Sequence, residues 1–204
     1  FRRIGVRAFQ LWLWDASGKL LMEKSDIELV DLAREGHKEA FSELVVRHQE
    51  AVYNLAFRMA GNHADATELA QNAFVRAYNK LALYKREYAF RNWVMSICAN
   101  QSRNLFRSRD RQRNAENTYL DLLEVNQPLP ESTRRAGVDR ALLHLPETLR
   151  IPVVLKHMEG LSYEEVGAVL NIGVSAAKMR VKRGIEKLSG LLCRGTNEAG
   201  YETE

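Results

Sequence analysis

Residues 161–183, LSYEEVGAVLNIGVSAAKMRVKR, read as two short helices joined by a tight turn, and they decide the fold of the second half of the chain. Ser162 followed three residues later by Glu165 is the pattern of a capping box at a helix start. An apolar stripe at helical spacing follows, made of Val166, Val169 and Leu170. The tripeptide Asn-Ile-Gly then interrupts the pattern, and we expect Gly173 to take a positive φ in the turn.

The second of these helices has an apolar face and a basic face. Its apolar positions recur at steps of three to four residues: Ala177, Val181, Ile185 and Leu188. The outer positions are Ser175, Ala176, Lys178, Met179, Lys182 and Arg183. This is the layout of a helix-turn-helix whose second helix enters the major groove of DNA. The alternative is an ordinary helical hairpin with a solvated basic face. Arg180 is ambiguous, because an ion pair with Glu164 or Glu165 explains it as well as DNA does.

Charge is unevenly distributed along the 204 residues, although the formal net charge is only +4. Residues 91–113 contain six arginines and one aspartate, and residues 174–194 contain six lysines or arginines and one glutamate. Residues 114–133 between them hold four acidic residues and no basic one. Two basic clusters separated by an acidic spacer indicate two contacts with a polyanion, made by separate modules.

The sequence shows no pattern typical of a disulfide-stabilised protein, a metalloprotein, an enzyme or a membrane-spanning protein. Cys98 and Cys193 form neither a disulfide framework nor a metal-type pair, which favours a reducing cytoplasm. The five histidines lack ligand spacing, and no nucleophile–base pair, phosphate-cradling glycine loop or metal cluster is evident. No apolar run approaches the roughly 18 residues that span a membrane. We therefore expect no catalytic residue, no metal and no cofactor.

The pattern of the chain after residue 21 is helical almost throughout, which predicts an all-α fold of two small helical domains joined by a flexible linker. Helices are expected over residues 26–34, 38–60, 64–81, 90–113, 135–144 and 146–159, besides the helix-turn-helix. Pro146 suits a first helical position, whereas Pro152 should kink its helix. The expected boundaries are a non-native or disordered extension (1–21), a first domain (22–113), an acidic linker (114–133), a second domain (134–195) and a disordered tail (196–204).

Three motifs in this order carry a family resemblance. The first is ATELAQNAF at residues 66–74, and the second is FRNWV from residue 90, running into Ala99-Asn100 and Arg103-Asn104. The third is LPE at residues 145–147 followed by GLSYEEV at residues 160–166. Together they resemble the extracytoplasmic-function (ECF) class of bacterial sigma factors, in the sigma-70 family. The resemblance covers about residues 22–195 and both family domains.

The resemblance implies a role for each basic module. The first domain would bind the β′ clamp helices of core RNA polymerase through Glu68, Leu69, Gln71, Asn72 and Phe74. It would also open and read the promoter −10 element through Lys85, Arg86, Tyr88, Asn100, Arg103, Asn104 and Arg107. The second domain would lie at the β flap and bind the −35 duplex through the outer residues of the recognition helix. The loop at residues 83–89 is a candidate for holding a flipped base, which needs aromatic and cationic surface. Phe90 and Trp93 are further aromatic candidates for capturing unstacked bases. They could instead fill the core, which we favour for Trp93.

Some positions depart from the family pattern. Glu68 and Asn72 stand where aspartate and glutamate are common, and Asn104 stands where many members have aspartate. Ala176 replaces a common threonine and loses a phosphate contact. Gly184 replaces a common alanine, which should cost the helix up to about 1 kcal/mol.

The resemblance also implies an inhibitory partner, an anti-sigma factor that is often membrane-bound and masks the polymerase-binding faces. It further implies that the acidic linker follows the RNA path of polymerase as a nucleic-acid mimic. Two rival functions remain: a dimeric helix-turn-helix regulator that binds operators alone, and a nucleic-acid enzyme that uses Glu68, Glu164 or Glu165 with a metal. Dependence on polymerase distinguishes the first rival from a sigma factor.

Overall fold

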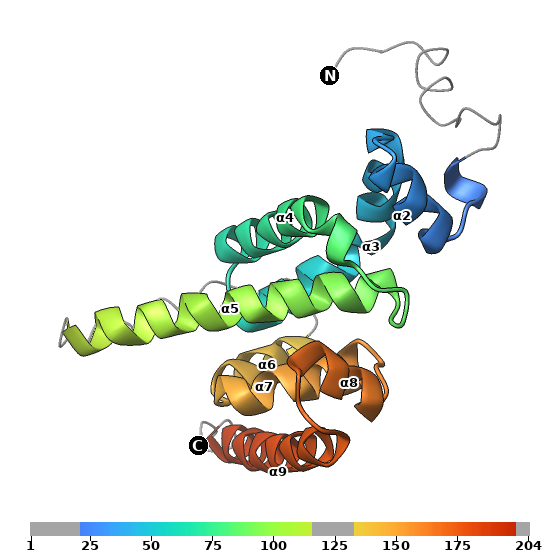
Figure 1. The fold of residues 1–204 in the computed structure, drawn as a ribbon. Coiled ribbons are helices and arrows are strands. Elements are labelled where there is room, and N and C mark those ends of the chain that lie inside the picture. The colour runs from blue at the N-terminus through green and yellow to red at the C-terminus, as the bar shows by residue number, and fades with distance from the viewer. Residues whose placement is uncertain (1–20, 116–132, 199–204) are drawn as a thin grey trace.

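The computed structural model describes residues 21–115 and 133–198, and every element in these ranges is a helix or a helical turn, so the all-α prediction is confirmed. The amino-terminal module contains η1 (Leu21–Glu23), α2 (Asp26–Arg34), α3 (Lys38–Ala60), α4 (His63–Asn79), η2 (Leu81–Leu83) and α5 (Phe90–Ala115). The carboxyl-terminal module contains α6 (Thr133–Leu143), α7 (Glu147–Val153), the π-helical turn η4 (Val154–Met158), α8 (Tyr163–Leu170) and α9 (Val174–Glu198). Figure 1 shows α5 between α4 and the layer of α6 to α8, with α9 on the outer side.

The amino-terminal module is a bundle in which α3, α4 and α5 bury one apolar face each. Val52 of α3, Ala73 of α4 and Met95 of α5 are fully buried. Phe90 is also fully buried, so it belongs to the core and offers no surface to a base. Trp93 is partly buried against this core, with its ring 5.8 Å from that of Phe90. The core alternative is therefore correct for Phe90, and Trp93 lies at the edge of the core.

Local sequence sets the boundaries of the helices in this module, with polar N-caps at the starts of α2 and α4 and a glycine at the end of α3. Ser25 forms a capping box with Glu28 at the start of α2. Asn62 accepts a hydrogen bond from the Asp65 N–H at the start of α4. Gly61 closes α3 with φ of 80°, a conformation that glycine adopts without a steric penalty.

The prolines of the carboxyl-terminal module act differently from the prediction. Pro146 is the N-cap residue of α7 and has an extended ψ of 139°, so it precedes the first helical position. Pro152 lies inside α7, where it cannot donate a backbone hydrogen bond. The chain responds directly afterwards by widening into η4, in which the Glu159 N–H donates to the Val154 carbonyl over 3.1 Å. The expected kink is thus a change from an α to a π turn.

The helix-turn-helix forms as predicted, with one correction in its turn. Ser162 and Glu165 make both bonds of the capping box, at 3.1 and 2.8 Å. The residue with positive φ is Asn171, at 52°, and Gly173 does not adopt that conformation. Asparagine tolerates the left-handed region because its short polar side chain bonds locally.

Gly184 has a packing role that helix propensity alone does not reveal. It lies in the buried face of α9 with Ala177, Val181 and Leu188. A Cβ atom at this position would collide with the side chain of Val153 and would lie 3.1 Å from the Leu149 carbonyl oxygen. The glycine therefore permits the close approach of α9 to α7.

The domain boundaries differ from the prediction by a few residues. Leu21, which was assigned to the extension, is buried and begins η1. Helix α5 continues to Ala115, and α9 continues to Glu198, inside the segment predicted as a tail. Residues 1–20, 116–132 and 199–204 lie outside the described residues, and so do the predictions made for them.

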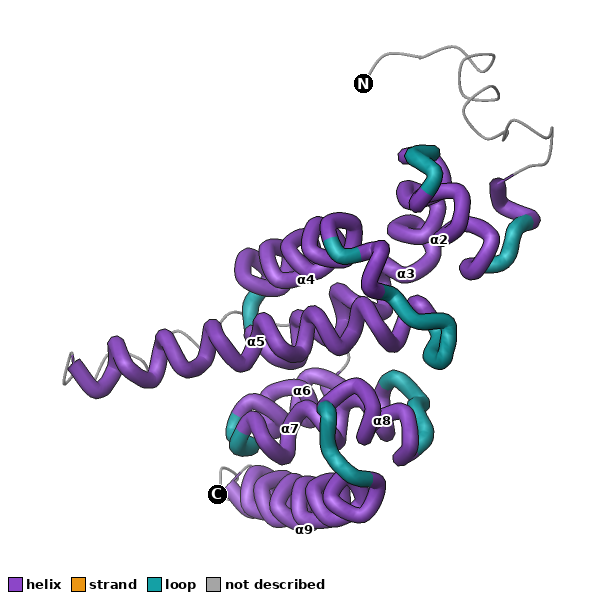
Figure 2. Tube along the Cα trace, viewed as in Figure 1, coloured by secondary structure: helices purple, strands orange, loops and turns teal. Residues whose placement is uncertain are grey.

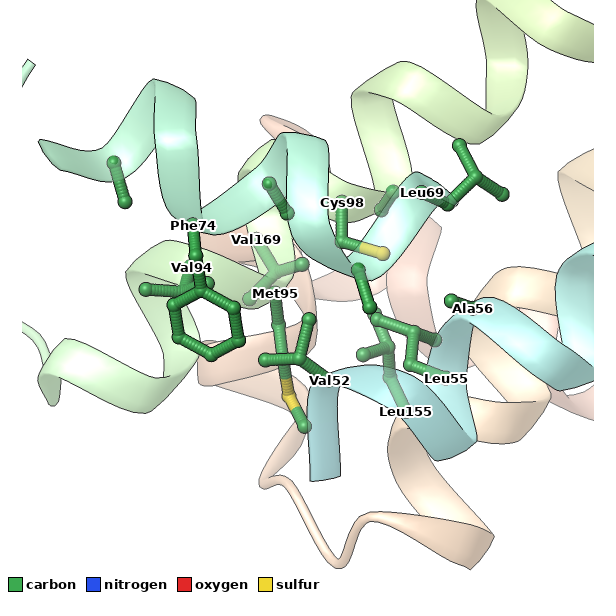
Figure 3. Packing of buried hydrophobic residues seen from close by; sticks show 14 of the residues in the cluster. Val52, Leu55, Ala56, Leu69, Phe74, Val94, Met95, Cys98, Leu155 and Val169 are labelled. Atoms are coloured by element: carbon green, nitrogen blue, oxygen red, sulfur yellow. The ribbon is translucent and has the colours of Figure 1, made fainter. Parts of the chain in front are cut away.

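The two modules share one hydrophobic core. Leu155 of η4 and Val169 of α8 belong to the same buried cluster as residues of α3, α4 and α5, and Figure 3 shows them beside Val52, Val94 and Met95. Figure 2 shows α6, α7 and α8 on the side of α5 that faces away from α4, with α9 beyond them. The sequence predicted two domains but did not predict that they pack together.

The two cysteines should react very differently. Cys98 is fully buried, and burial raises the pKa of its thiol to about 12, whereas Cys193 is exposed. The thiolate is the reactive species of a cysteine. We therefore expect a maleimide to modify Cys193 quickly in the native protein and to modify Cys98 only after denaturation. Mass spectrometry checks this, with Cys193→Ser as the control that should react only when unfolded. Rapid double labelling of the native protein would contradict the burial of Cys98.

Candidate nucleic-acid interface

The outer face of α9 is exposed at every position that the sequence assigned to DNA. These residues are Ser175, Ala176, Lys178, Met179, Lys182 and Arg183. The opposite face of α9 is buried against α7 and α8, so the basic face is fixed outward by the packing of its apolar residues. The arrangement presents a rigid helix with cations on one side, which suits the major groove.

The cations of this face have few competing partners. The Lys178 ammonium lies 5.7 Å from the centre of the Tyr163 ring, which the Lys156 ammonium also approaches at 4.7 Å. Lys182 lies 4.0 Å from Glu186, but both side chains are more than half exposed, so this pair contributes little stability. The face is therefore available for phosphates and base edges.

The alternative ion pair for Arg180 does not form. Within the described part of the chain, Arg180 has no ion pair with Glu164 or Glu165. Glu165 bonds the Ser162 backbone and accepts a hydrogen bond from the Asn92 amide of α5 at 2.7 Å. Those bonds stabilise the carboxylate, and the backbone bond from Ser162 is the main reason that the pKa of Glu165 is lowered.

The loop before α5 and the start of α5 surround a cavity of about 240 Å³. Lys85, Tyr88 and Trp93 line it from the amino-terminal module, and Glu165 and Val169 line it from α8. Two predicted −10 residues thus meet here beside an aromatic ring. Arg86 does not join them, because its guanidinium pairs with Asp31 at 2.5 Å.

Further along α5, the predicted −10 residues are only partly available. Asn100 is exposed and accepts a hydrogen bond from Arg103 at 3.2 Å. The Arg103 Nε atom also lies 3.4 Å from a Glu147 carboxylate oxygen of α7. The side chains of Asn104 and Arg107 lie outside the described residues.

The predicted polymerase-binding residues of α4 divide into two groups. Glu68, Gln71 and Asn72 are exposed on one face of the helix. Leu69 and Phe74 are each 7% exposed and belong to the core, so they hold α4 in place and do not present a surface. Val75 and Tyr78, which were not among the predicted residues, are 57% and 40% exposed and continue the same face at helical spacing from Gln71.

Neither a metal-binding group nor a membrane-spanning helix is found in the parts of the chain that the structure describes. Over residues 21–115 and 133–198, no group of histidine, cysteine, aspartate or glutamate side chains could hold a metal ion. In the same ranges, none of the helices has the length and apolar character that crossing a membrane requires.

Comparison with known proteins decides the family. The model of sigma-70 region 2 matches residues 44–112, and the model of sigma-70 region 4 matches residues 135–188. The ECF RNA polymerase sigma-E factor of Escherichia coli strain K12 is 32% identical over 178 residues, which cover 80% of this chain and 92% of that protein. The chain belongs to the ECF sigma factors.

Other relatives agree with this assignment. The ECF sigma factor SigE of Mycolicibacterium smegmatis is 35% identical over 165 residues, which cover 78% of this chain and 64% of that protein. Among solved structures, CnrH in complex with the cytosolic domain of CnrY is similar with a TM-score of 0.64 and 29% identity, covering 84% of this chain and 99% of that one. RpoE of Bartonella quintana, in complex with the anti-sigma factor NepR, has the same fold with a TM-score of 0.64 and 22% identity, covering 74% of this chain and 96% of that one.

The family assignment excludes one of the two rival functions, the stand-alone helix-turn-helix regulator. This ECF sigma factor carries region 2 and region 4 in family order, so it is not a stand-alone helix-turn-helix regulator. The motif at residues 66–74 and the motif from residue 90 both lie in region 2, and the helix-turn-helix lies in region 4.

Proposed function

We propose that this ECF sigma factor binds core RNA polymerase in the cytoplasm, directs it to specific promoters and helps to open the DNA. It acts by recognition and has no catalytic residue of its own. The observation that carries the proposal is the pairing of region 2 and region 4, each with an exposed polar or basic face. Its named relatives are RNA polymerase sigma factors, which supports the same role here.

Recognition of the −35 element falls to the outer face of α9. Lysine donates to the O6 and N7 atoms of guanine, and contacts with phosphates fix the register of the helix on the duplex. Lys178, Met179, Lys182 and Arg183 are exposed on this face. We expect Lys178 and Met179 to contact base edges, and Lys182 and Arg183 to contact phosphates.

Recognition of the −10 element requires the capture of bases as they leave the stack. Tyr88 is 48% exposed and lies with Lys85 beside the partly buried Trp93. A flat aromatic surface next to a cation binds an unstacked base through stacking and charge. Asn100 and Arg103 extend this surface along α5, and Asn104 and Arg107 follow them in sequence.

Binding of core polymerase falls to the exposed face of α4. Glu68, Gln71 and Asn72 supply polar contacts, and Val75 and Tyr78 add apolar area beside them. An anti-sigma factor would restrain the protein by covering such a face. The support for this partner is that the Bartonella RpoE was solved in complex with the anti-sigma factor NepR, and CnrH in complex with the cytosolic domain of CnrY.

Transcription in vitro tests the proposal. Purified core polymerase is incubated with a promoter library, with and without this protein. We expect discrete new start sites that share two spaced elements. Tight binding of DNA by the protein alone, without polymerase-dependent initiation, would overturn the proposed function.

The recognition helix can be tested on the promoter found in this way. Lys182→Ala should lower initiation roughly 5-fold and reduce the salt dependence of promoter binding by about one unit of slope, because one phosphate contact is lost. Lys38→Ala is the matched control, since Lys38 is an exposed lysine at the start of α3 in the other module. Equal losses in both variants would argue against a specific role of α9.

A further inference from the structure

The boundary between the two modules is crossed by ion pairs that all have the same polarity. Arg58 of α3 lies 3.3 Å from Asp139 of α6 and 3.4 Å from Glu159. Arg91 of α5 lies 2.6 Å from the second oxygen of Glu159. In each pair the amino-terminal module supplies the arginine and the carboxyl-terminal module supplies the carboxylate.

Glu159 is the centre of this set. Its side chain is only 6% exposed, and it receives two guanidinium groups from two different helices of the other module. Burial raises the pKa of this carboxyl, and the two arginines oppose that rise. A carboxylate buried between two arginines stabilises the arrangement only while both partners are in place.

Apolar contacts surround the ion pairs. Leu155 and Val169 lie in the common core, as Figure 3 shows. Leu143 of α6 packs so closely on Gly61, at the end of α3, that a Cβ atom there would lie 2.8 Å from the leucine Cδ1 atom. We call this packing of the two modules against each other the closed arrangement. It combines the burial of apolar side chains with ion pairs between the modules.

The same closure covers surface that the proposed function needs. Helix α8 forms one wall of the cavity that contains Lys85 and Tyr88, and Glu165 of α8 bonds Asn92. Arg103, assigned to the −10 element, pairs with Glu147 of α7. DNA phosphates cannot occupy this guanidinium face while a carboxylate of the other module lies against it.

We propose that the ion pairs of Glu159 with Arg58 and Arg91 form an intramolecular latch that holds the two modules closed and masks the −10 surface until a partner separates them. The inference rests on the proposed function for the identity of the masked surface, but the closure itself does not depend on it. The exposed face of α4 stays accessible in the closed arrangement, but the two modules would bind different parts of core polymerase, the β′ clamp helices and the β flap. Binding through both modules then competes with closure, so the apparent affinity for polymerase is reduced in proportion to the fraction of open molecules.

Small-angle X-ray scattering of the full chain tests the latch without polymerase. Glu159→Ala leaves Arg58 and Arg91 without their shared carboxylate in a poorly solvated boundary, which opening relieves. We expect the radius of gyration to rise above the native value. Glu164→Ala is the matched control, because Glu164 is an exposed glutamate of the same module and makes no ion pair in the described part of the chain. An unchanged radius in Glu159→Ala would overturn the latch.

A second variant separates opening from unfolding. Circular dichroism should show the same helix content in Glu159→Ala as in the native protein. If helix content falls instead, Glu159→Gln is the deciding variant, because it removes the charge that pairs with Arg58 and Arg91 and keeps the size of the side chain. A smaller but measurable rise in radius is then expected, and no rise would overturn the proposal.

The effect of the latch on activity is tested by measuring transcription initiation at increasing concentrations of core polymerase. In promoter-dependent transcription, Glu159→Ala should reach half-maximal initiation at a polymerase concentration at least threefold lower than the native protein, with the control unchanged. A rise in radius without this gain would show that closure does not compete with polymerase and would overturn the masking. Absence of initiation by the native protein would instead count against the proposed function.

Discussion

Replacing Arg150 with alanine is expected to lower the free energy of unfolding by about 3–5 kcal/mol, the largest effect of any single substitution considered for this protein. The Arg150 side chain is buried in α7 and donates to three backbone carbonyls. Its Nη1 group bonds the Met59 oxygen at 2.8 Å, and its Nη2 group bonds the Leu143 and Leu145 oxygens at 2.8 and 3.0 Å.

The size of this effect follows from where the carbonyls lie. The Met59 carbonyl is at the end of α3, and the Leu143 carbonyl is at the end of α6, so neither has the helical partner that an interior carbonyl has. Alanine would leave these groups buried without a donor, which costs about 1–3 kcal/mol for each. Burial removes water from the Arg150 guanidinium, and this loss of solvation lowers its pKa to about 10.

Urea unfolding followed by circular dichroism measures the loss. Arg150→Lys should recover only part of it, because one ammonium group cannot reproduce the fork that reaches three carbonyls. Arg76→Ala is the surface control, as Arg76 is exposed on α4, and it should change stability by less than about 0.5 kcal/mol. If Arg150→Ala matched this control, the bonding role assigned to Arg150 would be wrong.

Two glycine substitutions in α9 should change stability in opposite directions. Gly190 is exposed and has no heavy atom within 4 Å of a built Cβ, so Gly190→Ala should stabilise the protein by up to about 1 kcal/mol through helix propensity. Gly184→Ala gains the same propensity but forces a methyl group into Val153 and the Leu149 carbonyl. Overpacking of a core costs about 1–3 kcal/mol, so we expect a net loss.

The pair of variants is its own control, because both make the same chemical change in the same helix. Thermal unfolding of each variant and of the native protein gives the two signs directly. A gain in stability for Gly184→Ala would show that α9 moves away from α7 at little cost, and it would remove the packing explanation for this glycine.

The elements of this fold that depend on local sequence could be predicted. The capping box of Ser162 and Glu165 lies within four residues, and the two faces of α9 follow from a repeat of three to four residues. The helix-turn-helix and the exposed basic face were therefore accessible from the sequence, and the three motifs in order gave the family.

The details that were missed depend on residues far apart in the chain. Phe90 was considered for DNA binding because it is aromatic, but it is buried against Phe41 and His48 of α3, which lie more than 40 positions away in the chain. Leu69 and Phe74 carry the family pattern of a binding motif, yet they face the core. The pair between Arg91 and Glu159 joins residues 68 positions apart, and no periodicity within one helix indicates it.

The π turn that follows Pro152 has a consequence for how the chain tolerates insertions and deletions. Each residue of an α-helix advances the side-chain direction by about 100°, and the wider turn of η4 resets that direction just before Glu159. Loss of one residue here would leave the composition of the segment almost unchanged and would turn the carboxylate away from both arginines. The contact between the modules is therefore set by the angular phase of the backbone as much as by the identity of the residues that make it.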